Sequence, residues 1–435
     1  MELRLLKGTN DYLPEVQIIR ESIIRVLRET FELYGFNPFE TPILSYYDIL
    51  ASKYAGGSEI LKETYNLTDQ GNRELALRYD LTVPLSRVIG MNPHLKMPFK
   101  RYEIGKVFRN GPVTAIRSRE FTQCDIDTVG TKNQITEAEQ IAMTVQIFQK
   151  LGIDVFVEVN NRKLLSGIIE YSGVSEELTS SAILSIDKLK KIGKEGVKAE
   201  LIEKGIDDPA ILDKLFSIME ISGNWSDILV EIEKLIDNAR TKEGIKELRE
   251  FYSYLEAFGV ANKCKLLLSL ARGLEIYTGT VFEVFVADGS FKSSLAAGGR
   301  YDKIIGKFLQ IEEEIPAVGI SFGLESISGA LLAKNPETKK TVTDLLIVPV
   351  DSSALQNVLA LAQEFRKAAI STEIELTGAK MKKCLDRANK LGIGFVSVMG
   401  AREFEASKVN LKNMVTGEQS LVTLEEAIAL IKTKR

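Results

Sequence analysis

The stretch from Phe99 to Gly130 constrains the fold of this chain more than any other part of its sequence. Apolar and polar residues alternate in its first third, the pattern breaks at the Asn-Gly-Pro that begins at Asn110, and it resumes from Phe121 to Val129. This pattern predicts two antiparallel strands, joined by a loop that is too long for a tight hairpin turn.

Charged and polar side chains in this stretch form a second pattern. Because strand residues alternate between two faces, three of them should share one face of the second strand: Gln123, Asp125 and Asp127. Three arginines lie near the loop: Arg109, Arg117 and Arg119. Cations above a floor of carboxylates suit a ligand with one anionic end and one cationic or polar end. A solvated sheet face with ordinary salt bridges is the alternative.

Length and composition place the chain among globular proteins. Its 435 residues are too many for one hydrophobic core, so two or three domains are expected. A hydrophobic content of 45% with 27% charged residues is typical of a soluble protein. The net charge of −4 excludes bulk attraction to nucleic acid but allows a local basic surface. No apolar run reaches the ~20 residues of a membrane helix, and no signal peptide is expected.

Histidine and cysteine usage narrows the chemistry. His94 is the only histidine, which argues against a histidine-based catalytic dyad or zinc site, so no protein metal site is expected. The three cysteines, Cys124, Cys264 and Cys384, are far apart and argue against a disulfide framework. A reducing cytoplasm is the expected location.

Shifts in pattern along the chain predict its domains. Residues 1–162 mix strands and helices, and a helix is expected from Pro14 to Tyr34. The next strand carries Pro38 and Pro42, which places it at a sheet edge or subunit contact. Residues 163–258 read as a helical insertion, and the sheet pattern resumes over 259–333. Residues 343–435 alternate strand and helix, which predicts an α/β domain with a mostly parallel sheet.

Two local features allow a functional and a structural interpretation each. Asp80 and Thr82 lie where a strand should end and a helix begin, so they would either bind an ammonium group or cap that helix. Gly298 and Gly299 would either support a flat ring lying on the sheet or form a bulge.

Five motifs in register make the chain resemble the histidyl-tRNA synthetases, particularly their archaeal and eukaryotic-like branch. They are LRYDLTVP, KRYEIGKVFRN with REFTQCDID, LSLARGLEIYTGTVFE, SLAAGGRYD and AVGISFGLE. The resemblance implies a class II α+β catalytic domain with an antiparallel sheet and flanking helices, interrupted by the helical insertion and followed by an α/β anticodon-binding domain. It also implies a homodimer, with ATP, Mg²⁺, histidine and tRNA(His) as ligands and no membrane.

The resemblance implies a role for each matching residue. Asp80, Thr82 and Gln123 would hold the α-amino group of histidine, and Asp127 and Tyr277 its imidazole. Arg109 would bind the α-phosphate and the substrate carboxylate, and Arg272 would stabilise charge that develops on that phosphate. Arg117 would reach the outer phosphates, and Gly298 and Gly299 would line the adenosine site.

Some positions depart from the family pattern. Asn110 and Gly111 follow Arg109 where relatives have an acid that reads adenine, and Glu275-Ile276 replaces the usual Asp-Tyr. Ser326 stands where class II enzymes place an arginine near the γ-phosphate. Weak ATP binding is therefore expected. The leading interpretation is an active ligase, including the case of a divergent second copy. The alternatives are a histidine-binding paralogue without catalysis, such as a regulatory subunit of ATP phosphoribosyltransferase, and an accessory protein on the same scaffold.

Overall fold

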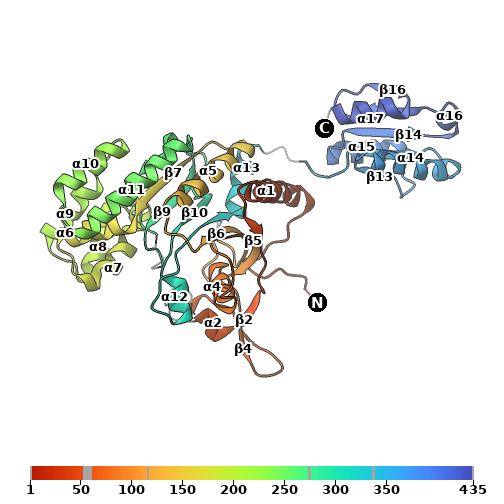
Figure 1. Ribbon diagram of the computed structural model, residues 1–435. Coiled ribbons are helices and arrows are strands. Elements are labelled where there is room, and N and C mark those ends of the chain that lie inside the picture. The colour runs from red at the N-terminus through yellow and green to blue at the C-terminus, as the bar shows by residue number, and fades with distance from the viewer. Residues whose placement is uncertain (1, 52–60, 115–116, 273–275, 336–338, 434–435) are drawn as a thin grey trace. The chain divides into compact units, whose positions relative to one another are not determined.

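The chain forms two compact units. The computed structural model describes residues 2–51, 61–114, 117–272, 276–335 and 339–433, and Figure 1 shows the order of their helices and strands. Residues 1–10 and 22–334 make the first unit, and residues 11–21 and 335–435 make the second. Among the described residues, no helix is both long enough and apolar enough to cross a membrane.

An eight-stranded sheet is the centre of the first unit. Its strands run in the order β1, β5, β6, β11, β10, β9, β7, β8. Their bounds are β1 (Asn37–Pro38), β5 (Phe99–Phe108), β6 (Glu120–Val129), β7 (Val155–Asn161), β8 (Cys264–Leu266), β9 (Thr280–Val286), β10 (Ala296–Arg300) and β11 (Ala317–Gly323). Within the described part of this sheet, only the two outer pairings, β1 with β5 and β7 with β8, are parallel. The two predicted antiparallel strands are confirmed as β5 and β6.

Different helices cover the two faces of this sheet. On one face, the ring of Phe322 lies 5.5 Å from that of Phe31 in α1 (Pro14–Leu33) and 6.2 Å from that of Phe148 in α5 (Ile135–Lys150). On the other, α4 (Thr82–Met91) and α12 (Ile304–Leu309) pack through Leu85 and Ile305 in a separate core. Figure 1 shows α5 and α13 (Leu324–Lys334) on one side of the sheet and α4 and α12 on the other.

The proline-bearing strand lies at a sheet edge, as predicted. β1 contains Pro38, is only two residues long and pairs only with β5 among the described strands. A separate three-stranded sheet follows, in the order β2 (Leu44–Tyr46), β4 (Glu74–Leu77), β3 (Asn66–Thr68), with α2 (Tyr47–Ala51) after β2. The strand expected to reach Asp80 already ends at Leu77, because Asp80 binds the first turn of α4 instead.

Six helices occupy the stretch that the sequence predicts to be a helical insertion. They are α6 (Arg162–Ser172), α7 (Glu176–Ile186), α8 (Leu189–Glu203), α9 (Pro209–Met219), α10 (Trp225–Leu235) and α11 (Ala239–Ala257). They belong to the first compact unit, so their standing as a domain of their own stays a prediction.

The second unit is an α/β fold around a mixed sheet. Its strand order is β13 (Thr372–Ile374), β12 (Leu345–Pro349), β14 (Phe395–Met399), β15 (Val409–Asn413), β16 (Gln419–Val422). Two pairings are parallel and two antiparallel, so the prediction of a mostly parallel sheet is wrong. The links over 400–408 and 414–418 are shorter than the dozen or more residues that a parallel crossover needs.

Both faces of the second sheet are covered. Val358 and Phe365 of α14 (Leu355–Lys367) and Ile431 of α17 (Leu424–Thr433) pack against one face. Cys384 and Ala388 of α15 (Met381–Leu391) pack against the other. Each core lies within the second unit, as expected for a part of the chain that folds around its own apolar residues.

Candidate functional site

The strand register brings small and charged residues together on one face of the central sheet. The prediction that Gln123, Asp125 and Asp127 share a face is confirmed by the unbroken pairing of β6. Their neighbours on β5 and β11 lie on the same face: Arg101 and Gly319 beside Asp127, Glu103 and Ser321 beside Asp125, and Gly105 and Gly323 beside Gln123. We call this surface the polar face.

Two glycines make room for the charged groups of the polar face. A Cβ atom on Gly319 would lie 2.1 Å from Asp127 Oδ1, and one on Gly105 would lie 2.2 Å from Arg78 Nη2. Any side chain at either position would therefore displace a buried charged group.

A buried ionic network fixes Asp127. Arg101 is fully buried, and its Nη2 lies 2.6 Å from Asp127 Oδ2 and 3.1 Å from the carbonyl oxygen of Leu81. The hydroxyl of Tyr301 donates to Asp127 Oδ1. The alternative of a solvated sheet face is thus wrong at this position, because the salt bridge is buried on both sides.

A second buried ion pair lies next to the first. Arg78 Nη1 is 2.9 Å from Glu103 Oε1, which also accepts from the backbone N–H of Thr41 at 2.9 Å. Arg101 Nη1 is 3.7 Å from Glu103 Oε2. The two pairs form one network on the polar face. A buried charge that loses its partner is strongly destabilising, so this network should hold the strands in a single register.

Burial raises the pKa values of two acids on this face. The pKa of Asp125 rises to about 7 and that of Asp127 to about 6, and the positive charge of Arg101 opposes the rise in both cases. Both groups therefore change protonation near neutral pH, where a cationic ligand would favour their ionised forms.

Asp80 lies at the start of α4. Its Oδ1 accepts from the backbone N–H groups of Thr82 at 3.0 Å and Val83 at 2.9 Å, so the capping interpretation is confirmed. Burial raises the pKa of Asp80, while those N–H groups and the charge of Arg109 lower it. The bonds to α4 use one of two carboxylate oxygens, so an ammonium contact by Asp80 remains compatible with them.

Arg109 lies against two aromatic rings. Its guanidinium carbon lies 4.3 Å from the ring centre of Tyr79 and 5.0 Å from that of Phe121, and its Nε donates to the carbonyl oxygen of Tyr79 at 3.3 Å. Burial raises the pKa of Tyr79 to about 12. The arrangement fixes a planar cation at the end of β5, close enough to Asp80 to lower its pKa.

Arg272 and Tyr277 lie beside each other. The guanidinium carbon of Arg272 is 5.4 Å from the ring centre of Tyr277, and its Nη1 is 3.4 Å from Glu283 Oε1. Burial raises the pKa of the buried Tyr277, Arg272 lowers it, and the charges of Asp125 and Asp127 raise it further. Tyr277 is therefore part of the same electrostatic site as the acids of β6.

The two adjacent glycines of β10 face opposite ways. A Cβ on Gly299 would lie 2.9 Å from the ring of Tyr277, whereas one on Gly298 would lie 2.1 Å from the carbonyl oxygen of Gly319 and 2.8 Å from the ring of Phe282. The pairing of β10 runs through both without a break, so the bulge interpretation is wrong. Only Gly299 lies on the polar face.

Two further predicted positions are Arg117 and Ser326. Arg117 is exposed, and its backbone pairs with Thr114. Ser326 lies in the first turn of α13. The departure noted at Glu275 concerns a position outside the described residues. Sequence reasoning missed Arg101, Tyr301 and Ser321. The GGRYD motif contains Tyr301 and could have identified it. The roles of Arg101 and Ser321 follow only from the pairing register of β5, β6 and β11.

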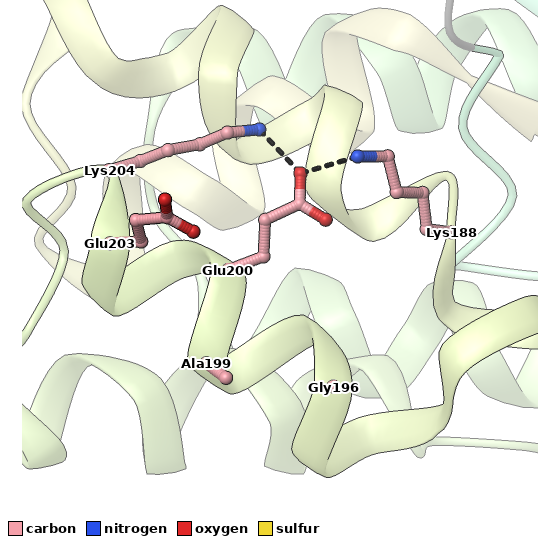
Figure 2. Close-up of a pocket in the computed structure, with 6 residues that line it drawn as sticks. All are labelled: Lys188, Gly196, Ala199, Glu200, Glu203 and Lys204. Atoms are coloured by element: carbon pink, nitrogen blue, oxygen red, sulfur yellow. Dashed lines mark hydrogen bonds and ion pairs between the residues drawn. The ribbon is translucent and has the colours of Figure 1, made fainter.

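A cavity of about 630 Å³ lies elsewhere in the first unit, along α8, and Figure 2 shows residues that line it. Its charged lining includes Glu200, whose Oε1 lies 2.7 Å from Lys188 Nζ and 2.8 Å from Lys204 Nζ. These two hydrogen bonds lower the pKa of Glu200 to about 2. Both lysines therefore pair with an acid of the cavity itself, and we assign it no ligand. Among the described residues, no group of three or more His, Cys, Asp or Glu side chains is placed to hold a metal ion.

Comparisons with known proteins cover nearly the whole chain. Residues 8–327 match the family model for histidyl-tRNA synthetase, and residues 344–434 match that for an anticodon binding domain. The chain is 45% identical to "Histidine--tRNA ligase 1" of Bacillus thuringiensis subsp. konkukian, over 98% of each chain. It is 43% identical to "Histidine--tRNA ligase 2" of Shouchella clausii, over 96% of this chain and 97% of the relative.

A solved structure gives the same result. The chain resembles the histidyl-tRNA synthetase of Nostoc sp. PCC 7120 with a TM-score of 0.88 and 30% identity, and the match covers 100% of both chains. The curated relatives named above are bacterial and give no support to the expected archaeal and eukaryotic-like branch.

Proposed function

Since the chain belongs to the histidyl-tRNA synthetase family, we propose how its own residues divide the work of histidine–tRNA ligation. The protein is a histidine–tRNA ligase, and its substrates are ATP, histidine and tRNA(His). The observation that carries the assignment of roles is the polar face, where fixed cations lie next to buried acids. The match of residues 344–434 to an anticodon binding domain weighs against a regulatory paralogue.

In this proposal the acids and Tyr277 select histidine. Asp80, Thr82 and Gln123 bind the α-ammonium group, and Asp127 and Tyr277 bind the imidazole. Both oxygens of Asp127 already have a protein partner, but each carboxylate oxygen can accept more than one hydrogen bond. Arg101 and Tyr301 then position Asp127 so that its remaining lone pairs face the substrate.

The arginines handle the phosphate chemistry. The histidine carboxylate is already a competent nucleophile, so the protein has to orient it in line with the α-phosphate and stabilise developing charge. Arg109, fixed between Tyr79 and Phe121, binds that phosphate and the carboxylate. Arg272 stabilises the transition state, Arg117 contacts the outer phosphates, and Gly299, with the backbone at Gly298, lines the adenosine site.

Magnesium fits this site as a companion of ATP. The described residues provide no ready cluster of acidic ligands, which suits an ion held mainly by phosphate oxygens and water. It would neutralise phosphate charge when bound. Because position 326 is a serine and not an arginine, Arg117 is the cation assigned to the outer phosphates. We expect ATP to bind weakly because one charged phosphate contact is missing.

Replacing Asp127 by alanine is expected to weaken histidine binding about 100-fold while the KM for ATP changes less than about 3-fold. The substitution removes the acceptor for the imidazole N–H and leaves the phosphate-binding arginines in place. Histidine-dependent exchange between pyrophosphate and ATP measures both constants, and the wild-type exchange itself tests the proposed activity.

The control for this substitution is Asp154→Ala. Asp154 pairs with Lys263 at 2.6 Å, its side chain is 71% exposed, and its loss should change neither constant. Because Asp127→Ala removes the buried partner of Arg101, thermal melting is used to check that the variant folds. The isosteric variant Asp127→Asn is measured beside it. Equal losses for histidine and ATP in a folded variant would contradict the assignment to histidine.

We also propose that the enzyme is a homodimer through residues 14–50. This region leaves apolar side chains in solvent: Leu44 is 51% and Tyr46 54% exposed. Light scattering at micromolar concentration should give twice the mass of one chain. Leu44→Glu with Tyr46→Glu should lower it to that of a monomer, whereas Leu376→Glu, at a position 83% exposed in the second unit, should not. A monomeric wild type would overturn the proposal.

The cytoplasm is the proposed location, because charging of tRNA serves protein synthesis there. The relatives named above carry the numbers 1 and 2 in their names, which supports the proposal that the chain is one of two copies in its source.

A further inference from the structure

We propose that Asp125 is a further acceptor for the α-ammonium group of histidine, beside Asp80, Thr82 and Gln123, and that Ser321 orients Asp125 and Gln123 for this contact. The inference rests on the histidine site proposed above and adds two residues to it. Asp125 lies between Gln123 and Asp127 on the polar face and is 5% exposed.

Two buried acceptor oxygens support this proposal. Asp125 Oδ1 and Gln123 Oε1 are each shielded from solvent and have no hydrogen-bond partner among the described residues. Leaving a buried acceptor without a donor is costly, so such groups in native proteins call for an explanation. Two of them, two residues apart on the same strand face, are explained together by one ligand that carries several N–H donors.

Ser321 bonds to both side chains and determines which of their atoms donate and which accept hydrogen bonds. Gln123 Nε2 donates to Ser321 Oγ at 3.1 Å, and the hydroxyl of Ser321 bonds to Asp125 and lowers its pKa. An ionised carboxylate only accepts, so the serine proton points to Asp125 and its oxygen accepts from the amide. Gln123 must then turn its carbonyl oxygen away from Ser321, which leaves that oxygen as the acceptor for the ligand.

An ammonium group matches this arrangement. It carries three N–H donors and no acceptor, and beside the hydroxyl of Thr82 the site offers the amide oxygen of Gln123 and the carboxylate oxygens of Asp80 and Asp125. Asp80 and Asp125 are close enough for the charge of Asp80 to raise the pKa of Asp125. The other charged groups that act on Asp125 are Arg101 and Asp127, and both of these already pair with each other. Asp125 is therefore the acid whose charge is left for the ligand.

The test compares two ligands that differ only in the ammonium group. Binding of histidine and of imidazolepropionate, which lacks that group, is measured by calorimetry for the wild type and for Asp125→Asn. The loss of a charge-assisted contact should weaken histidine binding about 10- to 100-fold. Imidazolepropionate, which has no ammonium group to lose, should bind both proteins within about 2-fold.

A second pair of variants isolates the role of Ser321. Ser321→Ala should weaken histidine binding about 3- to 10-fold by freeing Gln123 to turn, and Ser321→Thr, which keeps the hydroxyl, should restore it. Neither should change the affinity for imidazolepropionate or for ATP. These variants keep the proposal testable if Asp125→Asn fails to fold, which thermal melting detects.

Each result decides between explanations. Equal weakening of both ligands by Asp125→Asn would mean that Asp125 acts on the imidazole or on the fold, and the proposal would be wrong. Unchanged histidine binding in that variant would overturn it as well. A wild type that binds no histidine would instead refute the underlying assignment of the histidine site.

Discussion

Replacing Arg109 by alanine is expected to slow histidine-dependent pyrophosphate exchange about 1,000-fold. The two aromatic rings and the carbonyl oxygen of Tyr79 hold the guanidinium in one orientation before substrate arrives. A cation fixed in this way stabilises charge on the α-phosphate without reorganising during the reaction. Its removal should therefore lower kcat as well as affinity for ATP, with exchange kinetics at varied ATP separating the two.

Two further variants sharpen this test. Arg109→Lys keeps the charge but loses the planar fork and the stacking, so it should recover only part of the rate. Arg249→Ala removes an arginine that pairs with Glu233 at 2.7 Å on the helical stretch, and exchange should not change. If Arg109→Ala slowed exchange less than about 10-fold, another cation would have to hold the α-phosphate.

Removing residues 343–435 is expected to lower the rate of tRNA charging by about 1,000-fold or more while exchange stays within a few-fold of the wild type. Every proposed contact with histidine and ATP lies upstream, on the first unit, and the core around Leu85 and Ile305 consists of residues of that unit. Loss of several base and phosphate contacts to the anticodon arm, each of about 1–3 kcal/mol, accounts for the size of the effect.

A substitution within the full chain distinguishes lost contacts from lost folding. Lys382 and Lys383 are exposed on α15, and their joint replacement by alanine should weaken tRNA binding without changing exchange. The loss should shrink as salt concentration rises, because phosphate contacts are screened. A truncated, folded protein that charges tRNA as well as the whole chain would contradict the role given to this unit.

Local pattern predicted most of the elements. The period of two over 99–130 identified β5 and β6, and helical spacing identified α1, because burial on one face repeats with the period of the backbone. The same pattern did not predict the mixed sheet of the second unit. Strand direction there depends on whether a link is long enough for a crossover, and the links over 400–408 and 414–418 are too short for one.

The sequence by itself determined which groups are available: Gln123, Asp125 and Asp127 on one strand face, with Arg109 at its margin and Asp80 at a helix start. Only the tertiary structure decided what each group contacts. Asp127 is hydrogen-bonded to Tyr301, which is 174 residues away in the sequence, and Gln123 is hydrogen-bonded to Ser321, which is 198 residues away. Alternation fixes the face of a side chain, whereas its partner depends on strand order and register, which arise from packing between distant segments.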